Sequence, residues 1–401
     1  MKDQRRFLLV LRRMDVGGIE QATQTLAEAL ADVGHEVHVL VLKGSSRRRL
    51  SSNVHVHHLD VDRASRRGTG LAQHLLDRLV LSPLIKGSGF VWRGKRCTRV
   101  FSAFVAELEA THGDFDMILI RGQGAFENLW AFDDPRAWRV VEAITGRFAD
   151  SRRGRWLTRV LYRDKQVISV SHGVEQALNT YLETRDVPLA AHEVIYNAVP
   201  TGKLERLACA PISPTLPRPY LVHVGRLVPV KNQARLLRAF DLAIQQGLDH
   251  DLAIIGDGSQ RSALEALAGE LSLEGRVHFL GHQANPYPWV KHADALVLSS
   301  DFEGLGVVLI EALALNTPCI ACDVPGGISE VLIDEQRRLL CVPDDQALAD
   351  TMLDAVQHPL EVKPEWLKRF SEDSVVQQLL EITDRSSSHR RQRKFPDAST
   401  H

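Results

Sequence analysis

Two glutamates, Glu303 and Glu311, flank a glycine-containing turn and the start of an apolar run. From Gly306 onward the apolar residues recur at helical spacing, which predicts a helix start there and places Glu311 inside the helix. The backbone N–H groups of Leu305, Gly306 and Val307 would point out of that start, where roughly half a positive charge binds phosphate. A carboxylate accepts hydrogen bonds from sugar hydroxyls. A phosphate site beside a sugar site predicts that this segment binds a nucleotide sugar.

The sequence around these glutamates resembles the family-4 retaining glycosyltransferases, which have the GT-B fold. The signature of that family is two glutamates separated by seven residues, as Glu303 and Glu311 are. Further matches follow in the family's order over residues 220–335. They are residues 223–227 (HVGRL), 231–232 (KN), 255–258 (IGDG), 279–281 (FLG) and 326–327 (GG) with Glu330. The N-terminal half matches loosely, through residues 17–20 and 195–197.

The resemblance implies a role for each charged residue of the motifs. Arg226 and Lys231 would bind the donor diphosphate and stabilise the negative charge that develops as it leaves. Glu303 would bind the transferred sugar near its 3- and 4-hydroxyls, and Glu311 would bind the ribose hydroxyls. Taken singly, each cation has the alternative of an ordinary surface charge, and each carboxylate that of an acidic helix start. The combination favours a site in which Arg226, Lys231 and Glu303 are catalytic.

Four further residues are candidates for binding the donor. Gly17 and Gly18 follow the first predicted strand, and glycine lets backbone N–H groups come close to a phosphate. The resemblance implies that Gly281 begins a loop around the nucleobase, which His282 would line. Together with the helix start at residues 305–307, they complete the predicted donor site.

The acceptor side departs from the family pattern. Many members carry a histidine on a loop after a strand of the N-terminal domain, but the equivalent residues 140–146 contain none. Glu142 lies in this stretch and is a candidate for part of that role. Arg121 and His172 also follow predicted strands, and we expect them on the acceptor side. For His172 the alternative is a structural or surface histidine.

Motifs that would hold a metal are weak. Two segments, Asp60-Val-Asp62 and Asp114-Phe-Asp116, have the Asp-x-Asp sequence with which the other common glycosyltransferase fold binds its metal. Both are expected to be turns at strand entries. Cys319 and Cys322 have CxxC spacing in a short apolar run with no second Cys/His pair, so buried structural thiols are expected. Because Arg226 and Lys231 supply positive charge, we expect neither a metal nor another cofactor.

The composition, with 44% hydrophobic and 25% charged residues, is that of a soluble globular protein. A length of 401 residues is enough for two domains. Five scattered cysteines indicate a reducing compartment, and no apolar run reaches spanning length. Residues 1–200 hold 29 Lys/Arg against 23 Asp/Glu, whereas residues 201–401 hold 20 against 27. The basic half would face an anionic partner, with an ordinary solvated surface as the alternative.

Strands and helices alternate along the chain, which predicts an α/β protein with parallel sheets. With the resemblance, the fold class is GT-B: two Rossmann-like parallel-sheet domains facing across a cleft. A linker is expected over residues 197–219, which contain five prolines. The expected divisions are an acceptor-side domain (1–200), a nucleotide-sugar domain (201–370), a C-terminal helix returning toward the first domain (371–385) and a basic disordered tail (386–401).

The sequence therefore predicts a retaining hexosyltransferase with a UDP- or GDP-sugar donor. Its acceptor would be a saccharide or lipid-linked molecule, in cell-surface polysaccharide or lipopolysaccharide synthesis. The alternatives are a nucleotide-sugar epimerase on the same fold and a catalytically inactive binding homologue. Nucleic-acid binding is not expected, since no aromatic stacking pattern accompanies the basic residues. We expect the protein in the cytoplasm, with the arginine-rich residues 60–100, Phe90 and Trp92 resting at the inner membrane face.

Overall fold

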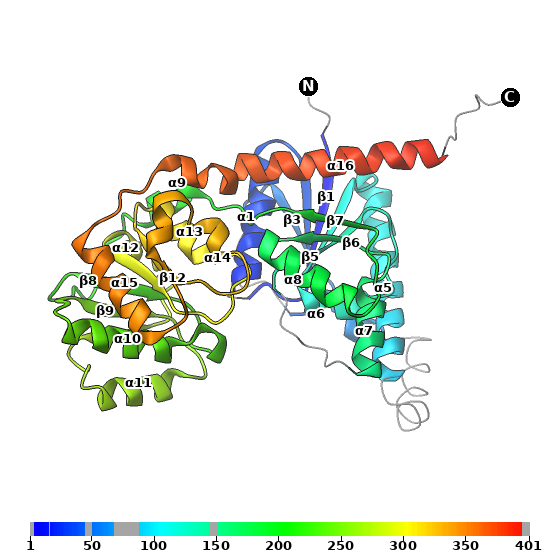
Figure 1. Ribbon diagram of the computed structural model, residues 1–401. Helices are drawn as coiled ribbons and strands as arrows, with labels where there is room; N and C mark the ends of the chain where they lie inside the picture. Colours follow the sequence, from blue (N-terminus) through cyan, green and yellow to red (C-terminus); the bar gives the residue numbers. More distant parts are fainter. Residues whose placement is uncertain (1–3, 16, 45–49, 68–87, 144–150, 395–401) are drawn as a thin grey trace. The chain divides into compact units, whose positions relative to one another are not determined.

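The computed structural model describes residues 4–15, 17–44, 50–67, 88–143 and 151–394 (Figure 1). Contacts between residues divide the chain into two compact units. The first unit comprises Met1–Val170, Glu175–Ala198 and Glu372–His401, and the second comprises Ser171–Val174 and Val199–Ser371. The first unit therefore contains both ends of the chain.

The first unit is built on a seven-stranded sheet in which neighbouring strands are parallel. The strand order is β3-β2-β1-β4-β5-β6-β7, with β1 inside the sheet as in Rossmann folds. Residues 7–11 of β1 are buried, since an inner strand of a covered sheet has both faces in the core. The strand predicted before Gly17 is thus confirmed as β1. The strands are β1 (Arg6–Leu11), β2 (Glu36–Val41), β3 (Val54–His58), β4 (Met117–Arg121), β5 (Ala137–Val141), β6 (Gln166–Ser169) and β7 (Ala191–Val194).

The last helix of the chain, α16, is part of the core of the first unit. It packs against α1, and its residues Val375, Leu379 and Thr383 are buried. The Thr383 hydroxyl lies 3.8 Å from the sulfur of Met117 in β4. The helices of this unit are α1 (Gly18–Asp32), α2 (Val61–Ala64), α5 (Ser88–His112), α6 (Gln123–Asn128), α7 (Arg152–Tyr162), α8 (His172–Glu183) and α16 (Glu372–Lys394).

The end of α16 corrects the predicted disordered tail. A helix was expected over residues 371–385 with disorder from 386 onward, but α16 continues to Lys394. The basic sequence of residues 390–394 suits a helix C-terminus, where positive charge complements the helix dipole. The remaining residues, 395–401, lie outside the described part of the chain.

The second unit has a six-stranded parallel sheet in the order β10-β9-β8-β11-β12-β13. The predicted linker contains a short helix, α9. Two Rossmann-like sheets confirm the predicted α/β class. The strands are β8 (Tyr220–Val224), β9 (Asp251–Ile255), β10 (Val277–Gly281), β11 (Ala295–Leu298), β12 (Cys319–Cys322) and β13 (Leu340–Cys341). The helices are α9 (Thr201–Leu207), α10 (Gln233–Gln245), α11 (Arg261–Glu270), α12 (Tyr287–Lys291), α13 (Val307–Ala314), α14 (Ile328–Val331) and α15 (Asp345–Gln357), with short 3₁₀ helices η2 (Pro229–Lys231), η3 (Asp334–Leu339) and η4 (Pro364–Phe370).

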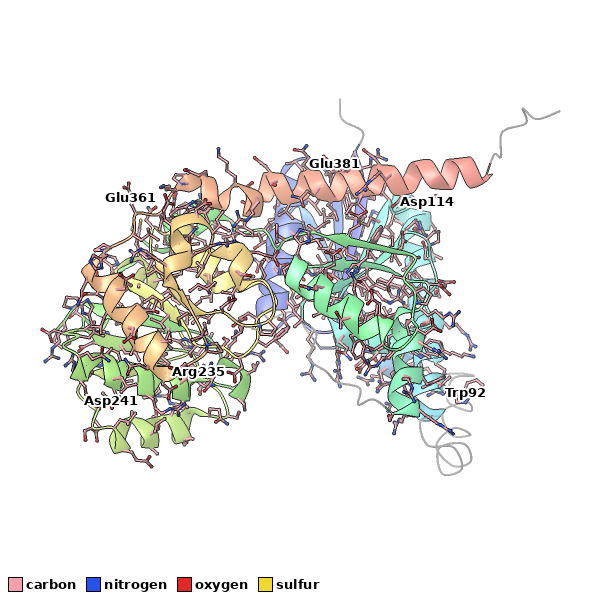
Figure 2. The ribbon with its side chains drawn as sticks, in the orientation of Figure 1. Trp92, Asp114, Arg235, Asp241, Glu361 and Glu381 are labelled. Atoms are coloured by element: carbon pink, nitrogen blue, oxygen red, sulfur yellow. The ribbon has the colours of Figure 1, made fainter. Side chains whose placement is uncertain are left out.

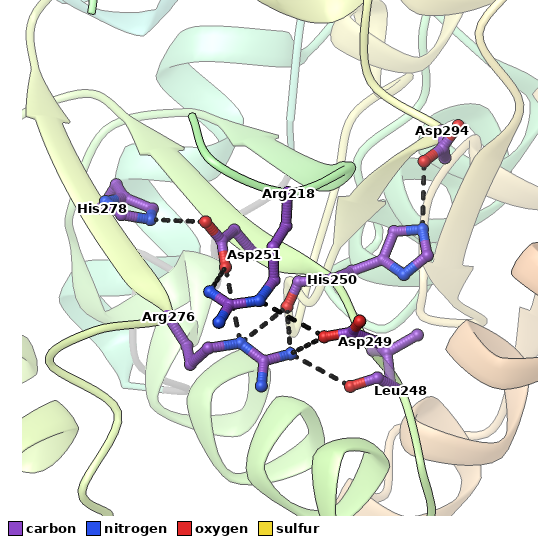
Figure 3. Close-up of polar contacts among 8 residues, drawn as sticks. All are labelled: Arg218, Leu248, Asp249, His250, Asp251, Arg276, His278 and Asp294. Atoms are coloured by element: carbon purple, nitrogen blue, oxygen red, sulfur yellow. Dashed lines mark hydrogen bonds and ion pairs between the residues drawn. The ribbon is translucent and has the colours of Figure 1, made fainter. Parts of the chain in front are cut away.

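A polar network centred on Asp251 closes the amino end of β9 (Figure 3). The Asp251 side chain is fully buried and accepts hydrogen bonds from Arg218 at 3.3 Å and His278 at 3.0 Å. Arg276 Nε lies 3.4 Å from the same carboxylate, and its Nη2 donates to the carbonyl of His250 at 2.7 Å. The network ties the amino ends of β9 and β10 to the chain before β8.

We expect Asp251→Ala to lower the free energy of unfolding by about 3 kcal/mol, because it leaves two arginines without their buried carboxylate. Chemical denaturation followed by circular dichroism measures this loss. The matched control is Asp249→Ala, since the Asp249 side chain is 85% exposed and its removal should change stability by less than about 0.5 kcal/mol. Equal losses in the two variants would contradict a special role for Asp251.

Candidate active site

Most predicted donor-site residues of the second unit lie on loops at the carboxyl ends of its strands, whereas Lys231 lies in η2 and Glu311 lies in α13. One loop follows β8 at residues 225–226, a second follows β9 at 256–258, and Gly281 ends β10. Two more loops follow β11 and β12, at residues 299–306 and 323–327. The carboxyl ends of parallel strands share one edge of the sheet, which is where such sheets bind ligands.

The start of α13 has the predicted position. Gly306 is its N-cap, with φ 76° and ψ 48°, a left-handed conformation that favours glycine. Leu305 is buried beneath the turn, and within the described part of the chain no side chain caps this helix start. The first backbone N–H groups of α13 therefore form a helix N-terminus suited to an anion.

Lys231 and Glu303 contact each other, although they are far apart in the sequence. The Lys231 ammonium donates to Glu303 Oε1, and Ser300 Oγ donates to the same oxygen at 2.6 Å. Glu303 is only 8% exposed, and the Lys231 carbonyl accepts from Ser299 Oγ at 3.0 Å. The site thus pairs a cation suited to a phosphate with a carboxylate suited to a sugar hydroxyl.

The loop that carries Glu303 is held by the first turn of α10. Arg235, which is labelled in Figure 2, donates to the carbonyl of Ser299 at 2.9 Å and forms an ion pair with Asp301 at 2.8 Å. Asn232 donates to Asp301 at 3.0 Å, and its own side-chain oxygen accepts from the Arg235 N–H at 3.2 Å. One short segment therefore positions Lys231 directly and Glu303 through its loop.

The double glycine at 326–327 lets two loops pack backbone against backbone. Gly326 has φ 121°, and a Cβ there would lie 1.5 Å from the carbonyl oxygen of Glu303. A Cβ on Gly327 would lie 2.8 Å from the carbonyl oxygen of Gly304. Gly326 also forms a parallel β-bridge with Glu303. These glycines fix the backbone of the Glu303 loop.

The backbone of Arg226 is held by a buried histidine and a glutamine. His223 is fully buried, and burial lowers its pKa to about 4, so the ring is neutral at physiological pH. Its Nδ1–H donates to the carbonyl of Val297 at 2.9 Å, which leaves Nε2 to accept from Gln233 at 3.1 Å. The Gln233 amide also donates to the Arg226 carbonyl at 3.0 Å. The Arg226 side chain itself is exposed.

Glycines after β9 allow the Arg226 turn to approach. A Cβ on Gly256 would lie 1.9 Å from the carbonyl oxygen of Gly225, and one on Gly258 would lie 2.3 Å from that of Leu227. The Gly256 N–H donates to the carbonyl of Gly281 at 2.8 Å. Gly281 has φ 69°, and the following His282 is exposed. The loops of β8, β9 and β10 are therefore directly connected.

Glu311 lies on α13 beside an aromatic hydroxyl. The Tyr287 hydroxyl donates to Glu311 Oε1 at 3.2 Å, and Tyr287 is buried whereas Glu311 is partly exposed. Tyr287 begins α12, so two helices meet at this carboxylate. The contact orients the Glu311 carboxylate on α13.

Arg121 and Glu142, two of the predicted acceptor-side residues, contact each other in the first unit. Arg121 is 3% exposed and donates to Glu142 Oε1 at 2.5 Å and to Asn197 Oδ1 at 2.7 Å. Asn197 completes the triangle by donating to Glu142 Oε2 at 3.0 Å. The adjoining cavity has a volume of about 20 Å³, enough for one water molecule but not a sugar. The guanidinium of Arg121 is thus engaged in positioning Glu142 and Asn197.

The remaining predicted site residues have simpler surroundings. His172 is exposed at the first turn of α8, in the short segment Ser171–Val174 that groups with the second unit. Its backbone N–H donates to Glu330 Oε2 at 3.0 Å. Gly17 is the extended N-cap of α1, and no described atom lies within 4 Å of a Cβ placed on Gly18. Internal packing therefore does not explain the glycine at position 18.

Both Asp-x-Asp segments have local structural partners. Asp60 accepts from the backbone N–H of Arg63 and caps α2, while Asp62 pairs with Arg66 at 2.6 Å. Asp116 accepts from the backbone N–H of Arg6 at 2.9 Å, at the entry to β4. The cysteines of the CxxC segment are buried, and burial raises the pKa of the Cys319 thiol. Asp114-Phe-Asp116 thus lies at a strand entry as predicted, and the CxxC thiols are buried as predicted. The strand-entry turn predicted for Asp60-Val-Asp62 is wrong, because this segment follows β3 and starts α2.

Several positioning residues were missed in the sequence. Gln233, Arg235 and Ser300 hold the backbone or the carboxylate of the predicted site residues. Gln233 and Arg235 stand just after the Lys-Asn motif, and Ser300 stands three residues before Glu303. Proximity to a motif was the available signal, but the direction of each side chain depends on the fold.

Residues 212–373 match the family model described as Glycosyl transferases group 1. The matched residues make up most of the second unit, so this part of the chain is similar to the group 1 glycosyl transferases, in agreement with the resemblance at this coarser level.

Two curated relatives extend the comparison. An uncharacterized glycosyltransferase of Methanocaldococcus jannaschii is 33% identical over 148 residues, which are 36% of this chain and 36% of that protein. The chain thus matches well under two thirds of that relative's length. The lipopolysaccharide core biosynthesis glycosyltransferase LpsD of Rhizobium meliloti is 25% identical over 390 residues, covering 93% of this chain and 97% of LpsD.

A solved structure extends the likeness over most of the chain. The crystal structure of HepE of Anabaena in complex with UDP and glucose matches with a TM-score of 0.65 at 18% identity. The match covers 95% of this chain and 100% of that chain. At this identity the similarity concerns the fold, which is the GT-B fold of glycosyltransferases.

Proposed function

We propose that this protein is a retaining glycosyltransferase that moves a hexose from a nucleotide sugar to a saccharide or lipid-linked acceptor. The observation that carries the proposal is the contact between Lys231 and Glu303 at the same sheet edge as the start of α13. A cation, a helix N-terminus and a carboxylate together suit a sugar diphosphate. The match of residues 212–373 to the group 1 glycosyl transferase model supports the same conclusion.

In the proposed reaction, the bond between the anomeric carbon and the diphosphate oxygen breaks, and the acceptor oxygen bonds to that carbon on the same face. The departing phosphate oxygen receives the acceptor's proton. Lys231, Arg226 and the N–H groups at the start of α13 stabilise the charge on the diphosphate. Glu303 holds the sugar hydroxyls, so the sugar is oriented while the bonds exchange. Because these groups supply positive charge, we propose that transfer needs no metal ion.

UDP-sugars are the first donors to test, with GDP-sugars next. HepE, whose fold is similar, was crystallised with UDP and glucose. The name of LpsD refers to the lipopolysaccharide core, which favours a saccharide acceptor on a lipid carrier. Gly281 and His282, at and just after the end of β10, are proposed to complete the donor site in the second unit.

The proposal is tested by nucleotide release from a panel of UDP-, GDP- and ADP-sugars, with and without acceptor extract, in EDTA. Release that requires one donor and one acceptor supports a metal-independent transferase. Conversion of the sugar without an acceptor would indicate an epimerase instead. No release and no thermal stabilisation by any donor would indicate an inactive homologue.

We expect Glu311→Gln to raise the donor KM about 10- to 100-fold with little change in kcat, since an amide replaces a charged acceptor of ribose hydrogen bonds. Initial rates over a range of donor concentrations measure this. Glu361→Gln is the control, because Glu361 is an exposed carboxylate in the same unit (Figure 2). An unchanged donor KM in Glu311→Gln would refute the ribose assignment.

The first unit carries a basic aromatic surface on α5 and α7. Trp92 is 39% exposed and Trp156 is 40% exposed, and the ring of Phe90 meets that of Trp156 edge-on. The exposed basic side chains of these helices include Lys95, Arg99, Arg152, Arg153, Arg155 and Arg159. Exposed tryptophans among arginines suit an anionic bilayer surface. Within the described segments, no helix has both the length and the apolar character needed to cross a bilayer.

We propose peripheral binding to the cytoplasmic membrane face through this surface, and we expect Trp92→Ser/Trp156→Ser to weaken flotation with anionic liposomes several-fold at low salt. Val33→Ser is the control, since Val33 is an exposed apolar residue of the same unit outside α5 and α7. Absence of wild-type binding to anionic liposomes at low salt would refute the proposal.

A further inference from the structure

A cluster of four histidines and one glutamate lies in the first unit, where β2, β3 and the end of α5 meet. Its members are Glu36, His38, His55, His57 and His112. Side chains alternate along a strand, so Glu36 and His38 share one face of β2, and His55 and His57 share one face of β3. The parallel register pairs His38 with His55. Three separate segments thus bring their ring nitrogens to one place.

The distances within the cluster are short. His38 Nε2 lies 3.2 Å from Glu36 Oε1, and His112 Nδ1 lies 3.1 Å from the same oxygen. The ligand atoms of Glu36, His38 and His55 all lie within 4.8 Å of one another. Two ligands on a tetrahedral zinc ion are about 3.4 Å apart, given bond lengths of about 2.1 Å. The observed separations are therefore close to those of a metal site.

Hydrogen bonds from neighbouring residues already orient Glu36 and His38. Glu36 Oε2 accepts from Arg6 Nε at 2.8 Å, which turns Oε1 toward the histidines. His38 Nδ1 lies 2.9 Å from His57 Nε2, so His57 Nε2 can accept a hydrogen bond from the Nδ1–H of His38. In that tautomer, His38 Nε2 carries a lone pair. That lone pair then faces a carboxylate oxygen, an arrangement that a cation between them would stabilise. Hydrogen bonds of this kind commonly support metal-binding histidines.

One side of the cluster is open to solvent. His38 is fully buried, whereas His55 is exposed, so an ion can enter from solvent. Imidazoles with a carboxylate are a ligand set that suits Zn²⁺ and related ions.

We propose that Glu36, His38 and His55 bind one divalent transition-metal ion of the Zn²⁺ class, with His112 as the fourth ligand. The ion would join β2 and β3 to the end of α5, and so would stabilise this edge of the first unit. This site is separate from the proposed donor chemistry, which uses residues of the second unit and needs no metal.

The test is a titration of the full chain, prepared without a polyhistidine tag and stripped with EDTA, with Zn²⁺ in a calorimeter at neutral pH. We expect one ion per chain and a rise of several degrees in the thermal unfolding midpoint. His55→Gln should weaken the affinity at least about 10-fold. His58→Gln is the matched control, because it removes an exposed histidine of the same strand whose side chain lies on the opposite face.

Two results would overturn the proposal. One is the absence of a one-to-one Zn²⁺ binding step in the wild-type chain, which would leave the cluster as a hydrogen-bonded network. The other is an equal loss of affinity in His55→Gln and His58→Gln, which would place binding elsewhere on the surface. Cobalt substitution gives a second measurement: His112→Gln should alter the visible spectrum of the Co²⁺-loaded chain. An unchanged spectrum would exclude His112 as a ligand.

Discussion

Lys231→Met is expected to lower kcat for transfer by about 10²- to 10³-fold, the usual effect of removing one group that stabilises a leaving charge. Methionine keeps an apolar stem of similar length and removes the ammonium. The lysine contacts Glu303 and follows the loop of β8. In the proposed reaction its charge acts where the sugar and the diphosphate are joined. Initial rates at saturating donor and acceptor measure the effect.

Two comparisons separate chemistry from structural damage. Lys291→Met removes an exposed lysine of the same unit, and its kcat should match the wild type. Lys231→Met also leaves the buried Glu303 without its cation, so stability can fall. Lys231→Met/Glu303→Gln should restore part of that stability but none of the activity. A wild-type kcat in the single variant Lys231→Met would refute the role of Lys231.

Gly326→Ala should lower the free energy of unfolding by about 3 kcal/mol and reduce activity at least about 100-fold. The left-handed backbone alone costs an alanine about 1–2 kcal/mol. In addition, its Cβ would lie 1.5 Å from the carbonyl oxygen of Glu303, so the two backbones must separate. A displacement of about 1 Å at a catalytic loop can cost about 100-fold in rate.

Thermal unfolding and initial rates measure these two effects of Gly326→Ala. Gly275→Ala is the matched control in the same unit, because nothing described lies within 4 Å of a Cβ at that position. It should leave both stability and rate near the wild-type values. Wild-type rates in Gly326→Ala would mean that the Glu303 loop does not depend on this backbone contact.

The helices and strands around the site could be predicted, because the residue patterns that form them are regular along the sequence. The helix after Gly306 follows from apolar spacing, and the parallel sheets follow from the alternation of strands and helices. The contact of Lys231 with Glu303 was not derivable from spacing, since it depends on how the loops after β8 and β11 meet. The resemblance to a family grouped these residues, but it assigned them roles without geometry.

Two other features lay beyond the sequence for physical reasons. Arg121 and Glu142 were separate candidates for the acceptor side, yet the pairing of β4 with β5 brings the buried Arg121 against Glu142, the residue after β5. The histidine cluster has no motif, because its members are gathered by strand register and by the end of a helix. Such a cluster can be recognised only in the three-dimensional structure, where side chains from different strands and helices come together.

The membership of α16 in the first unit has a consequence for synthesis. Helix α16 supplies buried residues beside α1, although it is made after the whole second unit. A chain growing on the ribosome has all of Val199–Ser371 before it has the helix that completes the first core. Domains usually fold in order from the N-terminus. In this chain the first unit begins to emerge from the ribosome before the second, but it can complete its fold only after the second unit has been made.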